Sequence, residues 1–224
     1  FSISLLHNIF SSDAGTFTDS DWFYMFGDDK VIYSESSTDL TAWILDANIQ
    51  TKNYRKEGTN DIGIAFMAGY RGNYFESDIY DSVQYNSFTG EEVEIQGKNL
   101  YYHINYYMPY FGAIINNSDS EQKLRWELMA AFSPYVSAKD YDDHILRYRI
   151  LKSETSGTAA MAGLDLSYNY NDNLSVMAGM HYKNIKTIGT QTQYTYDMEV
   201  LFEDIDSEIN SLQKQLYFGI NYEF

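Results

Sequence analysis

Apolar and polar residues alternate along much of this chain. At the C-terminal end the apolar set is Leu216, Phe218, Ile220, Tyr222 and Phe224, and most of the residues between them are polar or glycine. A period of two residues is typical of a β-strand whose two faces meet different surroundings, because successive side chains point to opposite sides. The same period recurs over 62–70, 102–110, 124–132, 160–170 and 174–182.

The alternation predicts an all-β chain of eight strands. These strands cover residues 1–10, 38–52, 61–77, 97–116, 122–137, 146–170, 173–187 and 208–224. The connections are short at 53–60, 116–121 and 171–173, and long at 11–37, 77–94, 138–145 and 187–206. Short turns at one end and long loops at the other are typical of an antiparallel transmembrane β-barrel. We therefore expect residues 1–224 to form a single barrel domain.

The two faces of the predicted strands suit a barrel in a membrane. One face is apolar and carries Tyr70, Tyr102, Tyr106, Tyr110, Tyr168, Tyr170, Tyr182 and Tyr222. The other face carries Asn105, Arg125, Glu127, Asp165 and His181. An apolar outside around a polar lumen is the reverse of a soluble barrel, and tyrosines at the interface bury the ring while the hydroxyl stays wet. A soluble antiparallel sandwich also alternates and is the competing fold.

Composition excludes several classes of protein. The 224 residues include no cysteine, 15 basic and 32 acidic side chains, which gives a formal net charge of −17. A chain without cysteine forms neither disulfides nor thiolate metal sites, and the acidic excess argues against binding to nucleic-acid phosphates. The mean hydropathy of −0.42 is compatible with a membrane barrel, because lipid-facing and lumen-facing residues average out.

Two acidic clusters in the predicted long loops are the candidates for chemistry. TFTDSDWF holds Asp19 and Asp21, and SAKDYDDHILRYR holds Asp140, Asp142 and His144. In an extended segment, residues two apart point the same way. A carboxylate beside a histidine fixes the imidazole tautomer and raises its basicity, and two close carboxylates share a proton. Together these groups predict attack of water on a carbonyl without a serine or cysteine nucleophile.

Simpler explanations of the same clusters stay open at this point. Extracellular loops are commonly acidic, so both clusters are also compatible with solvated charge. Metal binding is a further alternative, but an Asp-x-Asp pair with one histidine is a thin ligand set for zinc. We therefore expect no metal ion and no other cofactor of the usual kinds.

Five segments together carry a family resemblance. They are TDSDWF at 18–23, MAGY at 67–70, MPYFG at 108–112, the Asp-x-Asp-x-His of 140–144 and the terminal LYFGINYEF. In this order and spacing they resemble the omptin family of outer-membrane aspartate/histidine endoproteases, over essentially the whole chain. The resemblance implies a monomeric barrel in the cell outer membrane, with the active site facing the extracellular side.

The resemblance also implies a role for each charged residue of the two clusters. Asp19 and Asp21 match the family's paired aspartates, and Asp142 with His144 matches its Asp-His couple, with the attacking water held between the two couples. Asp140 matches the acid at the floor of the pocket that selects a basic side chain before the scissile bond. The implied substrates are polypeptides that are cut between two basic residues.

The chain departs from the family in its strands and in its substrate pocket. It resembles strands three to ten of a ten-stranded barrel, so we expect two N-terminal strands to be lacking, and with them the second acid of the basic pocket. Ser34 falls where the family has an acid that favours a basic residue after the scissile bond. The neighbouring Glu35, Asp28 and Asp29 are candidate substitutes.

A further departure concerns the membrane lipid. Omptins need lipopolysaccharide for activity, so outer-membrane lipid is an expected partner. Tyr70 is retained, but 71–74 read Arg-Gly-Asn-Tyr and Asn105 stands where a basic residue is expected, so the lipid-phosphate site is poorly matched. The sequence thus predicts an omptin-like endopeptidase, and the alternative is a non-catalytic barrel that acts as an adhesin or a structural protein.

Overall fold

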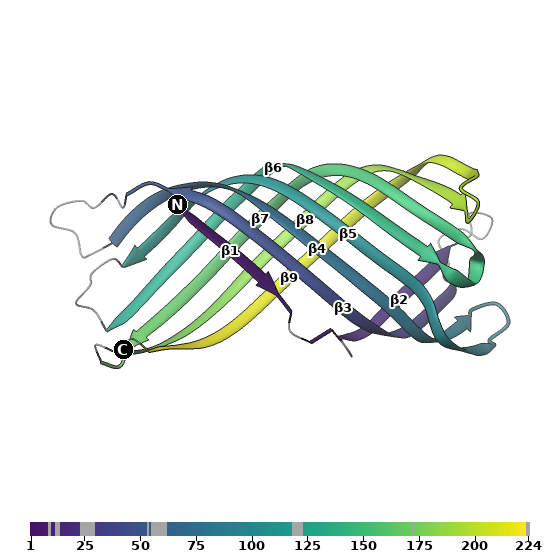
Figure 1. The fold of residues 1–224 in the computed structure, drawn as a ribbon, viewed down its shortest axis with the longest axis horizontal. Helices are drawn as coiled ribbons and strands as arrows, with labels where there is room; N and C mark the ends of the chain where they lie inside the picture. The colour runs from purple at the N-terminus through teal and green to yellow at the C-terminus, as the bar shows by residue number, and fades with distance from the viewer. Residues whose placement is uncertain are drawn as a thin grey trace.

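The computed structural model describes residues 1–8, 10–11, 14–22, 30–52, 54, 62–117, 123–171 and 173–222, without the side chains of 21, 22, 30 and 31. These residues form one antiparallel sheet (Figure 1). Its strands are β1 (Ser2–His7), β2 (Gly15–Trp22), β3 (Lys30–Gln50), β4 (Ile62–Asn86), β5 (Glu92–Asn117), β6 (Leu124–His144), β7 (Arg149–Asn169), β8 (Leu174–Thr195) and β9 (Val200–Tyr222), with the 3-10 helix η2 (Ile145–Arg147) after β6. No helix in this part of the chain is long and apolar enough to cross a membrane.

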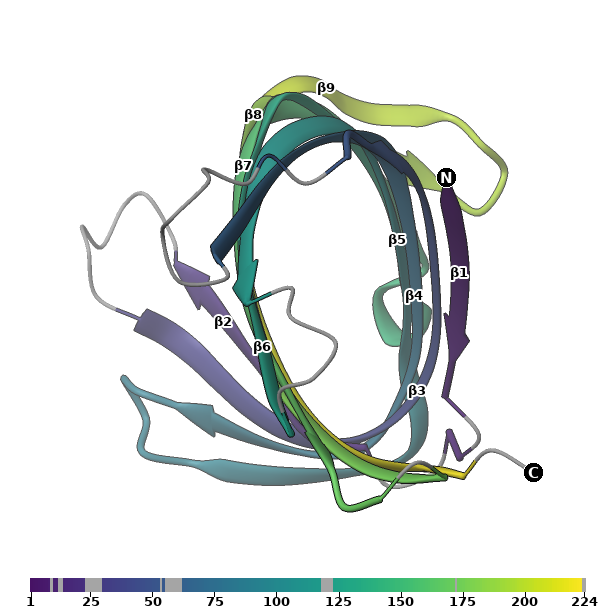
Figure 2. The ribbon, with the colours of Figure 1, turned by 90° about the vertical axis from the view of Figure 1, so that its left-hand side faces the viewer.

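The strands follow one another around the sheet. From β3 to β9 each strand pairs with the next one in the sequence, while β1 and β2 pair with two different stretches of the same edge of β3. The sheet curls into a barrel-shaped wall (Figure 2), and residues of both β1 and β9 line one interior cavity of about 470 Å³. The described residues contain no ladder between β9 and either β1 or β2. The predicted all-β antiparallel fold is confirmed.

The strands extend much further than the sequence predicts. β4 and β5 are joined by residues 87–91, β8 and β9 by residues 196–199, and β6 continues to His144. The expected long loop at 11–37 contains β2 and the start of β3. Backbone pairing needs no apolar side chains, so the ladders continue where the outer face becomes polar. Asp19, Asp21, Asp140, Asp142 and His144 therefore lie on strands, and the prediction that they lie in loops is wrong.

A belt of exposed apolar side chains covers the outside of the wall. It includes Leu45, Ile64, Phe66, Phe111, Leu128, Phe132, Leu166, Met180, Leu216, Phe218 and Ile220, and Phe218 is 84% exposed. Tyr70, Tyr168, Tyr170, Tyr182 and Tyr222 are exposed as well, as predicted. Exposed apolar side chains on so many neighbouring strands mark contact with an apolar environment. The inner face carries the predicted Glu127, Asp165 and His181, which line the 470 Å³ cavity.

On β5 the predicted direction of the two faces is wrong. Tyr106 and Tyr110 are 3% and 6% exposed, and Tyr102 packs against the same interior cluster of apolar side chains as Tyr106. The interior of this barrel contains bulky rings, and one of them is anchored by a hydrogen bond that the Tyr110 hydroxyl donates to Asp46 Oδ1 over 2.7 Å. Asn105 has the opposite parity to Tyr106 and so belongs to the outer face.

Both prolines of the chain lie where the β5–β6 pairing is interrupted. Pro109 falls in a register shift of β5, and Pro134 falls in the irregular step of β6 between Ser133 and Val136. Proline has no N–H to give to a ladder, so it belongs at such a break. The Ser133 hydroxyl lies 2.7 Å from the carbonyl oxygens of both Pro109 and Tyr135, which ties the two strands together across the break.

The break at Pro134 exchanges the two faces of β6. On the N-terminal side of the break the buried residues are Ala131 and Ser133, and on the C-terminal side they are Val136 and Ala138. An extra residue in one strand shifts the alternation by one position. As a result, the even-numbered residues of the upper part of β6 face the interior.

The close approach of β7 and β8 generates the first prediction. A Cβ at Gly157 would lie 2.0 Å from Lys186 O and 2.7 Å from Thr187 Cα, whereas a Cβ at Gly72 would have no heavy atom within 4 Å. We expect Gly157→Ala to lower the free energy of unfolding by about 1–3 kcal/mol, and Gly72→Ala to change it by less than about 0.5 kcal/mol. Urea unfolding in phospholipid vesicles, followed by tryptophan fluorescence, measures both. Equal unfolding midpoints for the two variants would show that β7 and β8 are not in such close contact.

Candidate functional site

One acidic residue of β2 and the last residue of β6 line the same cavity. Asp19 and His144 both line an interior cavity of about 300 Å³. The wall between them is built by three intervening strands, which contribute Ser34 and Ser36 from β3, Ser82 and Gln84 from β4, and Asn99 and Leu100 from β5. The curl of the sheet therefore brings together two groups that are 125 positions apart in the sequence (144 − 19).

Asp142 and His144 form a close Asp-His couple on the inner face of β6. His144 Nε2 lies 3.1 Å from Asp142 Oδ2, and both side chains are largely shielded from solvent. The two residues are two apart on one strand, so they share a face, and η2 begins directly after His144. The second oxygen, Asp142 Oδ1, is buried without a hydrogen-bond partner among the described atoms. This couple has the geometry of a histidine oriented by a carboxylate.

Asp19 lies on β2, which pairs with one edge of β3. It stands opposite Ser34 in the β2–β3 ladder, and its Oδ1 accepts a hydrogen bond of 2.8 Å from the backbone N–H of Ser20. The backbone of Asp21 continues β2 opposite Ile32, but its side chain lies outside the described part of the structure. The structure thus brings Asp19 to the cavity of His144 and leaves the predicted role of Asp21 as a prediction.

Asp140 lies one step further into the barrel on the same face. Residues two apart on a strand are separated by about 7 Å, and Asp140 Oδ1 accepts a hydrogen bond of 2.8 Å from the backbone N–H of Ser153. On the outer face of this level Lys139 and Glu154 form an exposed pair at 2.8 Å, so this part of the wall lies beyond the apolar belt. Burial raises the pKa of the Asp140 carboxyl, and the like charge of Asp142 raises it further.

Sequence reasoning missed a chain of small polar side chains at the site. The hydroxyls of Ser36 and Ser82 lie 2.5 Å apart, and Asn99 Nδ2 donates to Ser82 Oγ. All three side chains are buried and line the cavity of Asp19 and His144. The signal in the sequence is weak, because isolated serines and asparagines in strands have no characteristic pattern.

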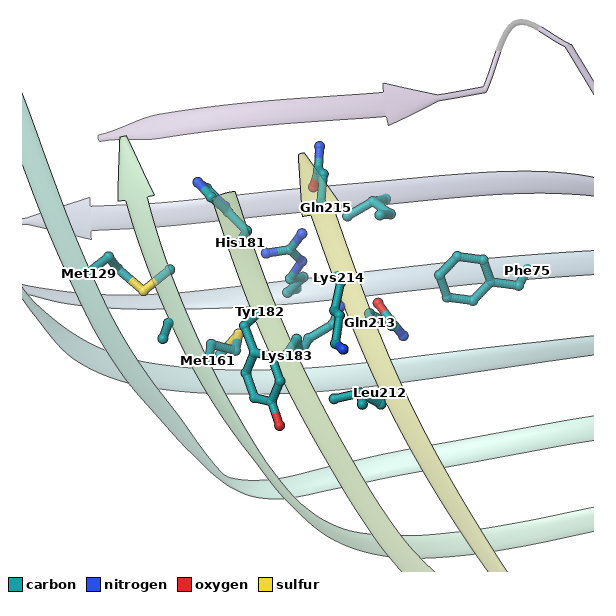
Figure 3. A pocket seen from close by; sticks show the side chains of 13 residues that line it. Phe75, Met129, Met161, His181, Tyr182, Lys183, Leu212, Gln213, Lys214 and Gln215 are labelled. Carbon is teal, nitrogen blue, oxygen red and sulfur yellow. The ribbon is translucent and has the colours of Figure 1, made fainter. Parts of the chain in front are cut away.

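A second Asp-His couple lies deeper, at the level of the apolar belt. His181 Nε2 lies 2.9 Å from Asp165 Oδ1, which also accepts a 2.5 Å hydrogen bond from the Tyr217 hydroxyl. His181 also borders a cavity of about 390 Å³, in which Figure 3 shows Lys183 and Gln213. Polar groups in the interior of a barrel require hydrogen-bond partners, and Asp165, His181 and Tyr217 supply them to one another. Within the described residues, no three histidine or acidic side chains gather closely enough to hold a metal ion.

Comparisons with known proteins agree on the type of chain. A model of the omptin family matches residues 6–224. The crystal structure of the outer membrane protease OmpT from Escherichia coli superposes with a TM-score of 0.82, covering 99% of this chain and 77% of that chain at 16% sequence identity. At this identity the likeness establishes the fold. A comparison with curated protein sequences finds no match.

The buried carboxyl of Asp140 generates a prediction about stability and pH. A carboxyl whose pKa is raised in the folded state destabilises that state when ionised, so stability falls as the pH rises from the unfolded pKa of about 3.9 through the folded value. We expect Asp140→Asn, whose amide oxygen still accepts from Ser153, to be more stable than the wild type by about 0.5–2 kcal/mol at pH 7.5. At pH 3 we expect no gain.

Denaturant unfolding in micelles at the two pH values measures this difference. The matched control is Asp143→Asn on the outer face, where the Tyr196 hydroxyl donates to Asp143 Oδ1 over 2.8 Å, and we expect no gain there. A gain for Asp140→Asn that is the same at both pH values would mean that burial of its charge is not the cause.

Proposed function

The chain belongs to the omptin family, and from this premise we propose that it is an outer-membrane endopeptidase with its cleft at the extracellular rim. The observation that carries the proposal is that Asp19, from β2, and His144, from β6, line one cavity. Two further observations support the location. The wall has an exposed apolar belt, and its strands extend beyond that belt with charged outer faces, as at Lys139 and Glu154.

The proposed chemistry starts from the Asp142–His144 couple. Asp142 Oδ2 accepts the hydrogen on His144 Nε2, which leaves Nδ1 able to take a proton from a water molecule. The oxygen of that water bonds to the carbonyl carbon of the substrate. Asp19, with Asp21 as its partner, positions the water and holds a shared proton, because two close carboxylates do not both ionise readily.

Addition of water gives a tetrahedral intermediate, which collapses with cleavage of the peptide C–N bond. The proton held by His144 passes to the departing nitrogen, so the products are an amine and a carboxylic acid and no other reactant is consumed. The path needs no covalent enzyme intermediate, in keeping with a chain that has no cysteine.

Asp140 supplies the proposed preference for a basic residue before the scissile bond. Its carboxyl lies on the same face as Asp142 and His144 and further into the barrel, with one oxygen bound to the Ser153 N–H. A partly desolvated carboxylate attracts a lysine or arginine side chain that inserts beside it. The net charge of −17 favours the approach of cationic peptides in the same way.

Single substitutions test the assignment. We expect His144→Ala and Asp19→Asn to lower the kcat for a quenched fluorescent peptide with one internal arginine by about 10³-fold or more. His181→Ala is the matched control, because it removes a histidine that is also paired with an aspartate but lies outside the cleft, and we expect its kcat to stay within about threefold.

The assay uses refolded protein in detergent, with and without added lipopolysaccharide, after a check that each variant is folded. Undiminished activity in both His144→Ala and Asp19→Asn would overturn the mechanism. Failure of the folded wild type to cleave any member of a peptide library, in either lipid condition, would favour the non-catalytic adhesin.

A further inference from the structure

We infer that the wall between Asp19 and His144 accepts an uncharged residue after the scissile bond, so that this protease cuts between a basic residue and a neutral one. The inference rests on the proposed function and adds the class of substrate to it. It is carried by the chemistry of the cavity lining, which differs from that around Asp140.

Neutral hydroxyl and amide groups make up most of the polar lining. Ser34, Ser36, Ser82 and Asn99 are all buried, and Gln84 adds a second amide. Such groups hydrogen-bond a hydroxyl, an amide or the substrate backbone. They carry no charge, so they do not compensate the desolvation of a lysine or arginine side chain.

Ser34 is the central residue of this wall. It lies directly opposite Asp19 in the β2–β3 ladder and directly opposite Gln84 in the β3–β4 ladder. In the proposed complex, the substrate residue after the scissile bond lies next to the water held at Asp19. Its side chain is therefore expected to contact Ser34 and Gln84 first. The Ser34 hydroxyl is uncharged, so it offers no countercharge to a lysine or arginine there.

The described lining also offers little negative charge to a basic residue. Asp19 is the one carboxylate among the described lining residues. Its proposed role is to position the attacking water molecule. Arg147, from η2, is also a lining residue, so the described lining does not have an excess of acidic over basic residues. Glu35 is exposed, and its Oε1 accepts a hydrogen bond of 2.7 Å from the Tyr33 hydroxyl, so it does not supply the acid that Ser34 lacks. Asp28 and Asp29 lie outside the described residues.

The experiment compares peptides that are identical except for the residue after a single arginine. Quenched peptides with Arg-Ser, Arg-Asn, Arg-Arg and Arg-Lys at the cleavage position are assayed with the wild type, and mass spectrometry locates the cut. We expect kcat/KM to be at least about tenfold higher for Arg-Ser and Arg-Asn than for the two dibasic peptides.

A charge introduced into the wall should move this preference. We expect Ser34→Asp to raise the ratio of Arg-Arg to Arg-Ser cleavage by at least about tenfold. Gln84→Glu, which is less buried, is a second variant with the same expected direction. The matched control is Ser37→Asp, because Ser37 lies on the same strand but is exposed and absent from the cavity lining, and we expect its ratio to stay at the wild-type value.

The outcomes separate the inference from the proposed function. Equal or faster cleavage of the dibasic peptides by the wild type would overturn the inference and leave the protease intact. An unchanged ratio in both Ser34→Asp and Gln84→Glu, with folded protein, would also overturn it. Cleavage of none of the four peptides would instead contradict the proposed function itself.

Discussion

Every side chain of a paired strand faces either the interior of this barrel or its outside, because an extended backbone offers no third direction. The whole molecule depends on this constraint. At the level of the apolar belt, one parity of β4, β7, β8 and β9 supplies the belt and the other faces the interior. In the first half of β6 the odd-numbered residues face the interior. If this alternation continued to the end of the strand, Asp140, Asp142 and His144 would face outward. The step at Pro134 resolves this conflict.

Two similar Asp-His couples lie at different heights along the barrel axis. The Asp165–His181 couple lies at the level of the apolar belt, and Asp165 Oδ1 also accepts a hydrogen bond from Tyr217. The Asp142–His144 couple lies above the belt, retains a buried carboxylate oxygen without a partner and borders the cavity that contains Asp19. Between the two levels, Ile104, Tyr106, Met108 and Val136 pack into a buried apolar cluster. The same pair of residue types thus forms part of an interior hydrogen-bond network at one level and is proposed to act on the substrate at the other.

The sequence was sufficient for the features that depend on local alternation. The outward apolar sets at 62–70 and 160–170, and the shared face of Asp142 and His144, follow directly from a period of two. The direction of β5 was not accessible in this way, since alternation shows which residues share a face and not which face is interior. Tyr106 and Tyr110 are chemically suited to both sides.

Long-range features were also beyond the sequence. The extension of the strands past the membrane belt is set by pairing between chain segments, which polar residues join as readily as apolar ones. The convergence of Asp19 with His144, and the Ser36–Ser82–Asn99 chain, depend on the curl of the sheet across several strands. The family resemblance implies the proposed roles of the two acidic clusters, but the neutral wall between them follows only from the three-dimensional structure.

The central claim is that Asp19 and His144 act on one water molecule as a single unit. A double-mutant cycle in kcat/KM, with Asp19→Asn, His144→Ala and the combination, measures this most directly. Groups that serve one step lose their joint contribution when either is removed, so we predict that the double variant is no slower than the slower single variant. Losses that multiply in the double variant would contradict the account.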